Sequence, residues 1–285
     1  MKKILIQLDT DQLPSSFDRV VALDAGADEL LSYGGVTPDN IVPLVHGAIF
    51  TRGPGDLKNT AIFVGGSDVH AAEKVFEKVQ QTFFGPMRVS TMIDANGSET
   101  TAAAAVRSAS KHISFQKADA LVLGGTGPVG QRTAELLASQ GARVRVASRS
   151  LDRAKDTVSE ILNKYDGANV VPCECSDDGL AAAVDGIQLL FACGAAGVQF
   201  LTAEEWRSID TLKVAVDVNA VPPVGLDGIS VTDKAEDHNG IPCYGAIGVG
   251  GLKMKIHKAA IQRLFQSNDQ VLKTDAIYAL SNDLT

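Results

Sequence analysis

Short apolar runs alternate with amphipathic stretches along the first half of the chain. Apolar positions recur at helical spacing through Asp68–Phe83, and Gly65-Gly66 followed by Ser67 or Asp68 predicts a turn into that helix with a polar cap. Four runs are predicted strands: Lys3–Leu8, Ala48–Phe50, Ala61–Val64 and Met87–Ile93. The order of these elements predicts β-α-β units.

The same alternation is stricter in the second half. After the polar stretch Asp94–Thr101, an Ala-rich run to about Ser110 predicts a linking helix capped by Ser98 or a neighbouring Thr, with a domain boundary nearby. The predicted strands and helices that follow are Ala120–Leu123, Pro128–Ser139 (helix), Arg143–Ala147, Leu151–Lys164 (helix), Val170–Pro172, Gly179–Val184 (helix), Gln188–Ala192 and Lys213–Val218. This order is typical of a doubly wound nucleotide-binding sheet.

The C-terminal segment is predicted to be helical. Ile247–Gly251 predicts a Gly-rich turn, followed by a helix from about Leu252 to Phe265 and a last helical stretch near Asp275–Asn282. Such helices often return to pack on a first domain. At 285 residues the chain is long for one hydrophobic core, so either two α/β domains with a cleft between them or one domain with a large appendage is expected.

Composition and charge exclude several classes of protein. The formal net charge is −8, from 34 acidic and 26 basic residues, and no basic block is present, which argues against nucleic acid as a partner. No apolar run approaches the roughly 20 residues that cross a bilayer, and the N-terminus turns polar too early for a signal peptide. We therefore expect a soluble, cytoplasmic protein with no membrane partner.

Cysteine and histidine positions do not predict a disulfide framework or a metal site. Cys173, Cys175, Cys193 and Cys243 are oddly spaced and are expected to be reduced thiols, although the first two could be half of a metal site. The five histidines have no common spacing for a metal. His257 is more easily interpreted as structural than as catalytic.

The strongest local signal is Gly125-Thr126-Gly127-Pro128-Val129-Gly130, which matches G-x-G-x-x-G directly after a strand and at the start of a helix. In this motif Gly125 would permit the tight turn, Gly127 would let the backbone approach a pyrophosphate, and Gly130 would let the helix pack on the strand. The helix amides would face the phosphates. A Gly-rich turn without a ligand is the alternative.

The end of the second strand of this unit predicts which dinucleotide binds. A site that prefers NAD usually carries Asp or Glu there, but this chain has Ser148-Arg149-Ser150, with Arg153 one turn later. A guanidinium and hydroxyls would bind the 2′-phosphate of NADP with charge-assisted hydrogen bonds. Arg149 could instead be a solvated surface residue.

Two later loops follow predicted strand ends, where ligands lie in open α/β sheets. Cys193, Gly194 and Ala195 in the first loop, and Asn219 in the second, are expected beside the nicotinamide half of the cofactor. Asp217 could hold structure or bind ligand.

Long strings of the chain resemble the bacterial NADP-dependent methylene-tetrahydromethanopterin dehydrogenases, some of which also use methylene-tetrahydrofolate. The resemblance covers nearly the whole chain and is carried by FDRVVALDAGAD, YGGVTPDN, IFTRG, TAIFVGGSD, FFGPMRVSTMIDANGSETTAAAAV, GTGPVG, DVNAVPPVG and GAIGVGGLKMKIH. It implies reversible hydride transfer from the methylene-pterin to NADP, which gives the methenyl form, in one-carbon metabolism and methylotrophy. Which of the two pterins is preferred stays open.

The resemblance also implies a domain plan and a homo-oligomer. Residues 1–110 and 254–285 would form the smaller pterin-binding α/β domain, and residues 111–253 the Rossmann-type NADP domain, with a cleft that closes by hinge motion. Alternatives are another two-domain NADP oxidoreductase of shikimate-dehydrogenase-like plan and a non-enzymatic NADP sensor.

Candidate substrate residues follow from the resemblance together with side-chain chemistry. Lys253 is the candidate catalytic and pterin-contacting residue, with Lys255 as second choice, and the Asp18 carboxylate could accept paired N–H bonds from the amino-pyrimidine. Further candidate walls and anchors are Phe17, Tyr33, Thr37, Pro38, Asn96 and Thr101. Related folate dehydrogenase–cyclohydrolases have Tyr-x-x-x-Lys, whereas Thr37 follows Tyr33 here, so cyclohydrolase activity is not expected.

Overall fold

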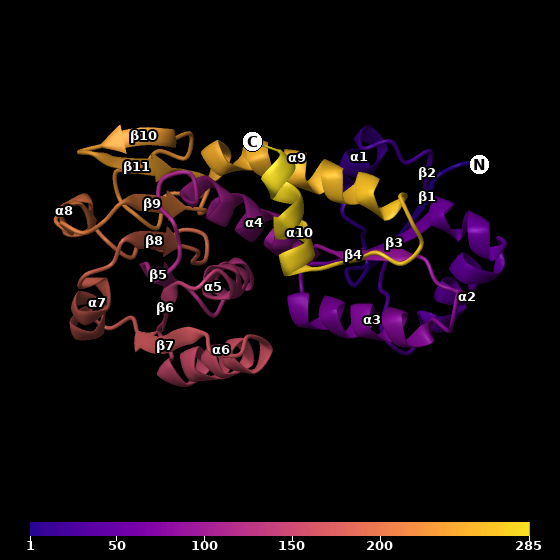
Figure 1. The fold of residues 1–285 in the computed structure, drawn as a ribbon, viewed down its shortest axis with the longest axis horizontal. Helices are drawn as coiled ribbons and strands as arrows, with labels where there is room; N and C mark the ends of the chain where they lie inside the picture. Colours follow the sequence, from indigo (N-terminus) through magenta and orange to yellow (C-terminus); the bar gives the residue numbers. More distant parts are fainter. Residues whose placement is uncertain (285) are drawn as a thin grey trace. The chain divides into compact units, whose positions relative to one another are not determined.

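The computed structural model describes residues 1–284, apart from the side chains of residues 177 and 178. The chain forms two compact units. The terminal unit comprises Met1–Thr100 and the chain from Met254 onward, and the central unit comprises Thr101–Lys253. Two helices, α4 (Ser98–Ala109) and α9 (Ala246–Leu264), contain the points where the units divide (Figure 1).

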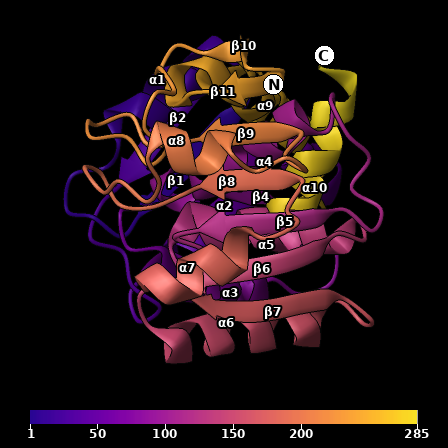
Figure 2. The same ribbon diagram turned by 90° about the vertical axis from the view of Figure 1, so that its left-hand side faces the viewer.

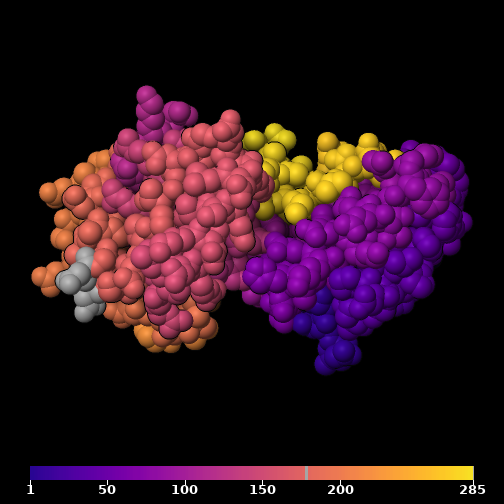
Figure 3. Space-filling model, turned by 90° about the horizontal axis from the view of Figure 1, so that it is seen from below, coloured from indigo at the N-terminus to yellow at the C-terminus, as the bar shows by residue number. Residues whose placement is uncertain are grey.

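Within the described chain, the terminal unit holds a parallel five-stranded sheet in the order β12-β4-β3-β1-β2. Its strands are β1 (Ile4–Asp9), β2 (Glu29–Tyr33), β3 (Thr60–Gly65), β4 (Ser90–Ile93) and β12 (Val271–Leu272). Its other elements are α1 (Ser16–Asp24), α2 (Val42–Phe50), α3 (Val69–Thr82), α10 (Thr274–Leu280) and the 3-10 helices η1 (Pro54–Asn59), η2 (Ala95–Gly97) and η3 (Ser281–Asp283). In the space-filling view, the C-terminal segment lies against the first hundred residues (Figure 3).

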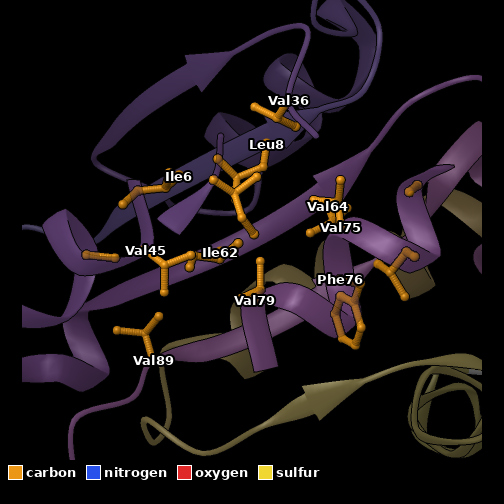
Figure 4. Packing of buried hydrophobic residues seen from close by; sticks show 14 of the residues in the cluster. Ile6, Leu8, Val36, Val45, Ile62, Val64, Val75, Phe76, Val79 and Val89 are labelled. Atoms are coloured by element: carbon orange, nitrogen blue, oxygen red, sulfur yellow. The ribbon is translucent and has the colours of Figure 1, made fainter. Parts of the chain in front are cut away.

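Helices α2 and α3 cover one face of this sheet. Ile62 and Val64 of β3 pack there with Val45 of α2 and Val79 of α3, in one buried apolar cluster (Figure 4). Alternate residues of β3 face the other side, where Phe63 stacks on His257 of α9 at 5.8 Å between ring centroids. Both faces are therefore covered, as parallel sheets require.

In the described part of the central unit, a seven-stranded sheet has the order β10-β11-β9-β8-β5-β6-β7 and is parallel except for β10 (Figure 2). Its elements are β5 (Asp119–Leu123), α5 (Pro128–Ser139), β6 (Arg143–Ser148), α6 (Leu151–Lys164), β7 (Asn169–Glu174), α7 (Asp177–Val184), β8 (Leu189–Ala192), α8 (Ala203–Arg207), β9 (Val214–Asp217), β10 (Lys234–His238) and β11 (Ile241–Tyr244). Because β6 and β8 lie on opposite sides of β5, the strand order reverses there. This is the switch point at which such sheets bind ligands.

The structure confirms the α/β class and most of the predicted elements, but three local predictions were wrong. Ala48–Phe50 is not a strand: it ends helix α2, in which Val45, Ala48 and Ile49 are buried at helical spacing. The cap of α4 is not Ser98 or a Thr side chain. The Asp94 carboxylate accepts the N–H groups of Glu99 and Thr100, at 2.9 and 3.0 Å.

The third correction concerns Ile247–Gly251, which is helical instead of a turn. Glycine lets the start of α9 lie against a neighbouring backbone: a Cβ on Gly245 would overlap the carbonyl oxygen of Ser230, and a Cβ on Gly248 that of Asp233. The N–H of Ile247 donates to Val231 O at 2.7 Å, which fixes this contact. These glycines are needed for close packing between chain segments. In the sequence alone, glycines with this role look the same as glycines in a turn.

Elements that the sequence did not predict are short or half-exposed. Helix α1 and strand β2 mix exposed and partly buried positions, and β12 has two residues and is recruited to β4 from far along the chain. In residues 1–284, no helix is both long and apolar enough to cross a membrane.

Candidate functional site

A cavity of about 520 Å³ lies at the carboxyl ends of β5, β6 and β8 in the central unit. Its lining includes nine of the predicted cofactor residues: Thr126, Gly127, Ser148, Arg149, Ser150, Arg153, Cys193, Gly194 and Ala195. It also includes Gly124, Cys175, Val198 and Phe200. The structure therefore brings the glycine turn, the Ser-Arg-Ser segment and the loop after β8 to one place.

The turn after β5 depends on glycine at two backbone contacts. Gly124 has φ +68°, and a Cβ there would lie 2.7 Å from the Cα of Gly194. A Cβ on Gly130 would overlap the carbonyl oxygen of Gly124. The tight turn thus uses Gly124, whereas Gly125 packs against the side chain of Val146 on β6. Close approach of helix and strand at Gly130 is as the motif predicts.

The N-terminus of α5 lies at this cavity. Gly127 is the N-cap, and none of the side chains that the structure describes caps the first turn. Pro128 at the first helical position has no N–H, while Val129 continues the helix. An uncapped first turn leaves backbone N–H groups for an anion, and the helix dipole adds to their effect. Pro128 and Val129 shape this terminus without lining the cavity.

Hydroxyl groups connect the glycine turn to the end of β6. The Oγ of Ser148, 7% exposed, lies 3.2 Å from Thr126 Oγ1 and accepts the Ser150 N–H at 3.3 Å. Ser150 in turn caps α6 by accepting the Arg153 N–H at 3.4 Å. Arg149 and Arg153 are exposed and line the cavity. Two guanidinium groups therefore border a turn already rich in donors, an arrangement suited to phosphate.

The cavity residues that the sequence did not predict come from neighbouring strands. Cys175 follows β7, and burial raises the pKa of its thiol to about 11, with Cys173 adding to this effect and the Gly124 N–H and Arg149 opposing it. Phe200 is in the loop after β8, and its ring touches Gly194, where a Cβ would overlap the ring. Neither residue belongs to a recognised spacing.

Asn219 is buried and lies outside the cavity lining. Its Nδ2 donates to the carbonyl oxygen of Ala195 at 3.3 Å, so it holds the loop after β8. Asp217 accepts the N–H groups of Asn219 and Leu226, at 2.9 and 2.7 Å, and burial raises its pKa. Of the two interpretations of Asp217, the structure shows the hydrogen-bonded structural one. Cys193 is buried in the cavity wall, and burial raises the pKa of its thiol to about 12.

The carboxyl ends of the parallel strands in the terminal unit collect several predicted substrate residues. Phe17 and Asp18 begin α1 after β1, and the Ser15 hydroxyl caps this helix by accepting the Asp18 N–H. Gly65 at the end of β3 faces two carboxylates: a Cβ there would lie 3.4 Å from Asp9 Oδ2 and 3.8 Å from Asp18 Oδ2. Phe17 is 50% exposed, with its ring 6.3 Å from that of His257.

The other candidates divide between this edge and the central unit. Tyr33 ends β2 and is 39% exposed, and Thr37 and Pro38 follow in the next loop. Asn96, exposed and with φ +52°, lies in η2 after β4. Thr101 in α4 and Lys253 in α9 belong to the central unit, and both are half-buried, whereas Lys255 is exposed.

His257 is an interior residue of the terminal unit. It is fully buried, stacks on Phe63, and has its Nδ1 3.9 Å from Asp94 Oδ2. Among the side chains that the structure describes, no group of three or more His, Cys, Asp and Glu residues is placed to hold a metal ion.

A doubly wound sheet, a glycine turn at its switch point and an arginine-bordered cavity define the central unit as a Rossmann-type nucleotide-binding fold. Three relatives of this fold have low sequence identity. Quinate dehydrogenase from Corynebacterium glutamicum, solved with NAD, is 15% identical, with a TM-score of 0.54 over 99% of this chain and 100% of that one. The ligand-free 5-ketofructose reductase of Gluconobacter is 13% identical, with a TM-score of 0.58 over 100% and 99%. Shikimate 5-dehydrogenase from Listeria monocytogenes has a TM-score of 0.55.

The chain belongs to the methylene-tetrahydromethanopterin dehydrogenase family. The model of the family's N-terminal domain matches residues 16–96. The bifunctional protein MdtA of Methylorubrum extorquens is 46% identical over 99% of both chains. The NAD(P)-dependent methylenetetrahydromethanopterin dehydrogenase of the same organism is 31% identical over 84% of this chain and 82% of that protein.

Proposed function

We propose that this protein transfers a hydride reversibly from methylene-tetrahydromethanopterin, or its tetrahydrofolate analogue, to NADP and so gives the methenyl form in one-carbon metabolism. The observation that carries the proposal is the cavity at the switch point of the central sheet, in a chain related over its whole length to this family. The MdtA relative is the more similar of the two Methylorubrum proteins.

The residues of the cavity fit a phosphorylated dinucleotide. The uncapped start of α5 and the close approach allowed at Gly127 suit the pyrophosphate. The 2′-phosphate would be bound by the guanidinium groups of Arg149 and Arg153 and by the hydroxyl of Ser150. Among the described residues that line the cavity there is no carboxylate that would repel this phosphate. NADP is therefore the preferred cofactor. When bound, its nicotinamide ring supplies the hydride acceptor.

In this reaction the main task of the protein is to orient the two reactants, and proton transfer is not required in the hydride step. Removing a hydride from a carbon between two nitrogens leaves a cation spread over both nitrogens, so no proton leaves in that step. The protein contributes by holding the two reactants at reacting distance and by excluding water from the product cation. This step therefore needs no general acid or general base.

The carboxyl edge of the terminal sheet is proposed to bind the pterin. Asp18 would accept two N–H bonds from the amino-pyrimidine, with Phe17 and Tyr33 as apolar walls. Polar or rigid contacts would come from Thr37, Pro38, Asn96 and Thr101. The 50% exposure of Phe17 and the position of Asp18 beside Gly65 support this assignment.

Lys253 is proposed to contact the pterin or the nicotinamide as an orienting cation. Its partial burial favours it over Lys255, which is exposed on the same helix. Its ammonium group could donate to a pterin carbonyl. We also propose residues 1–110 with 254–285 as the pterin domain and 111–253 as the NADP domain, a division that differs from the two compact units only in residues 101–110 of α4 and the turn after it.

The resemblance that supports this activity also supports a cytoplasmic homo-oligomer. Cell fractionation would check the location, and light scattering of the purified protein would check the assembly.

The direct test is an activity assay with the purified protein. With methylene-tetrahydromethanopterin and NADP, we expect absorbance of the methenyl product and of NADPH to rise together. The tetrahydrofolate analogue, and NAD in place of NADP, are the comparisons that measure preference. Tight NADP binding without turnover of either pterin would favour a cofactor sensor and contradict the proposal.

A further inference from the structure

The cavity of the central unit has two chemically different ends. Strand β5 carries the glycine turn, and its neighbours are β6 on one side and β8 on the other. The β6 side supplies Arg149 and Arg153, whereas the β8 side supplies Val198 and Phe200. A dinucleotide whose pyrophosphate lies at β5 must extend its two halves in opposite directions along this sheet edge.

We propose that Phe200, supported by Val198, is the apolar surface that positions the nicotinamide ring of the cofactor. This inference rests on the proposed NADP-dependent function. If the phosphate on the adenosine ribose is held by the arginines, the flat carboxamide-bearing nicotinamide ring falls at the opposite, apolar end. An aromatic ring there offers a stacking or edge contact to a flat heterocycle and keeps water from that side of it.

Phe200 is held by backbone contacts on both sides. Its N–H donates to the carbonyl oxygen of Gly225 at 2.8 Å, which ties it to the loop after β9. Its ring fills the space beside Gly194, and Gly194 in turn touches Gly124 of the glycine turn. The ring is therefore held in a fixed place next to the glycine turn.

Val198 extends the same surface, and its supporting loop is fixed from behind. The carbonyl oxygen of Ala195 accepts two hydrogen bonds. One comes from Asn219 Nδ2 and the other from the N–H of Val198, each at 3.3 Å. These two hydrogen bonds fix the conformation of the loop from within the chain. Pre-organisation of this kind lowers the entropy lost on binding.

Calorimetry with two ligands tests the proposal. The probes are NADP and adenosine 2′,5′-bisphosphate, which keeps the 2′-phosphate but has no nicotinamide. For Phe200→Ala we expect about three- to tenfold weaker NADP binding, the range of one aromatic contact, with bisphosphate affinity unchanged. Phe200→Leu, which keeps most of the apolar volume, should lie between. Val198→Ala should show a smaller effect in the same direction.

Steady-state kinetics adds a readout that a folding defect would not give. Phe200→Ala should lower kcat as well as raise the KM for NADP, with the KM for the pterin unchanged. Equal losses for both calorimetric probes, or unchanged NADP binding and kcat, would overturn the role of Phe200 and leave the proposed function intact. Failure of the wild-type protein to bind NADP would instead reject the proposed function itself.

Discussion

The two units carry similar, largely parallel sheets, but the carboxyl edges of these sheets have opposite chemistry. At the edge of the central sheet, the turn after β5 offers backbone N–H groups and the end of β6 offers Arg149 and Arg153. At the edge of the terminal sheet lie Asp9 at the end of β1, Asp18 in the first turn of α1, and Asp94 directly after β4. One edge is rich in donors and positive charge, and the other is rich in acceptors.

This difference matches the two ligands of the proposed function. Phosphates need donors and cations, whereas an amino-pyrimidine presents N–H groups that need acceptors. The carboxylates of the terminal unit also build their own loops: Asp9 accepts the N–H groups of Asp11 and Ser15, at 2.9 and 3.0 Å, and Asp94 caps α4. The same carboxylates therefore have two roles: they hold the local backbone by hydrogen bonds, and they give this edge its acceptors and negative charge.

The largest expected effect comes from Gly130→Ala, which breaks the donor-rich edge. The new Cβ would meet backbone atoms, the carbonyl oxygen of Gly124 and the Cα of Gly125, which cannot move aside as a flexible side chain would. We expect the free energy of unfolding to fall by about 1–3 kcal/mol and NADP binding to be lost. Denaturant unfolding and calorimetry measure the two changes.

The matched control is Gly47→Ala in helix α2 of the terminal unit, where a Cβ meets nothing within 4 Å. Removing a helical glycine in open space should raise stability by up to about 1 kcal/mol. If Gly130→Ala left the free energy of unfolding as little changed as Gly47→Ala does, α5 would not pack closely on the glycine turn, and this prediction would be contradicted.

Next in size is Arg149→Ala, which removes one cation from the donor-rich edge. We expect NADP to bind about 10- to 100-fold more weakly, since a hydrogen bond to a charged group contributes about 1.5–3 kcal/mol, while NAD binding changes little. Arg149→Lys keeps the charge but loses the forked geometry and should fall between. Parallel titrations of NADP and NAD measure this selectivity, and equal losses for both would contradict a 2′-phosphate contact.

The smallest effect is expected from Asp18→Asn, which weakens the acceptor-rich edge. The amide keeps one acceptor oxygen but loses the charge, so the KM for the pterin should rise by about tenfold while the KM for NADP stays constant. Asp24→Asn, at the other end of α1 where Asp24 pairs with Lys258 at 2.9 Å, is the control and should change neither. A pterin KM unaffected by Asp18→Asn would remove Asp18 from the proposed site.

Local sequence patterns predicted those parts that depend on neighbours along the chain. The glycine turn and the Ser148-Arg149-Ser150 segment were predicted because strand, turn and helix follow each other within a few residues, and the structure places both at one cavity. The strand predicted at Ala48–Phe50 was wrong because a short apolar run has the same composition in a buried strand and in a buried helical turn.

The α/β class, the family and the glycine turn follow from the sequence alone, because each is encoded in contiguous residues with a fixed period or spacing. Only the tertiary structure decided that Cys175 and Phe200 line the cavity while Asn219 holds the loop behind it. These residues meet because the sheet order places β7 and β8 on opposite sides of the β5–β6 pair, and strand order is a long-range outcome of packing that no local pattern encodes.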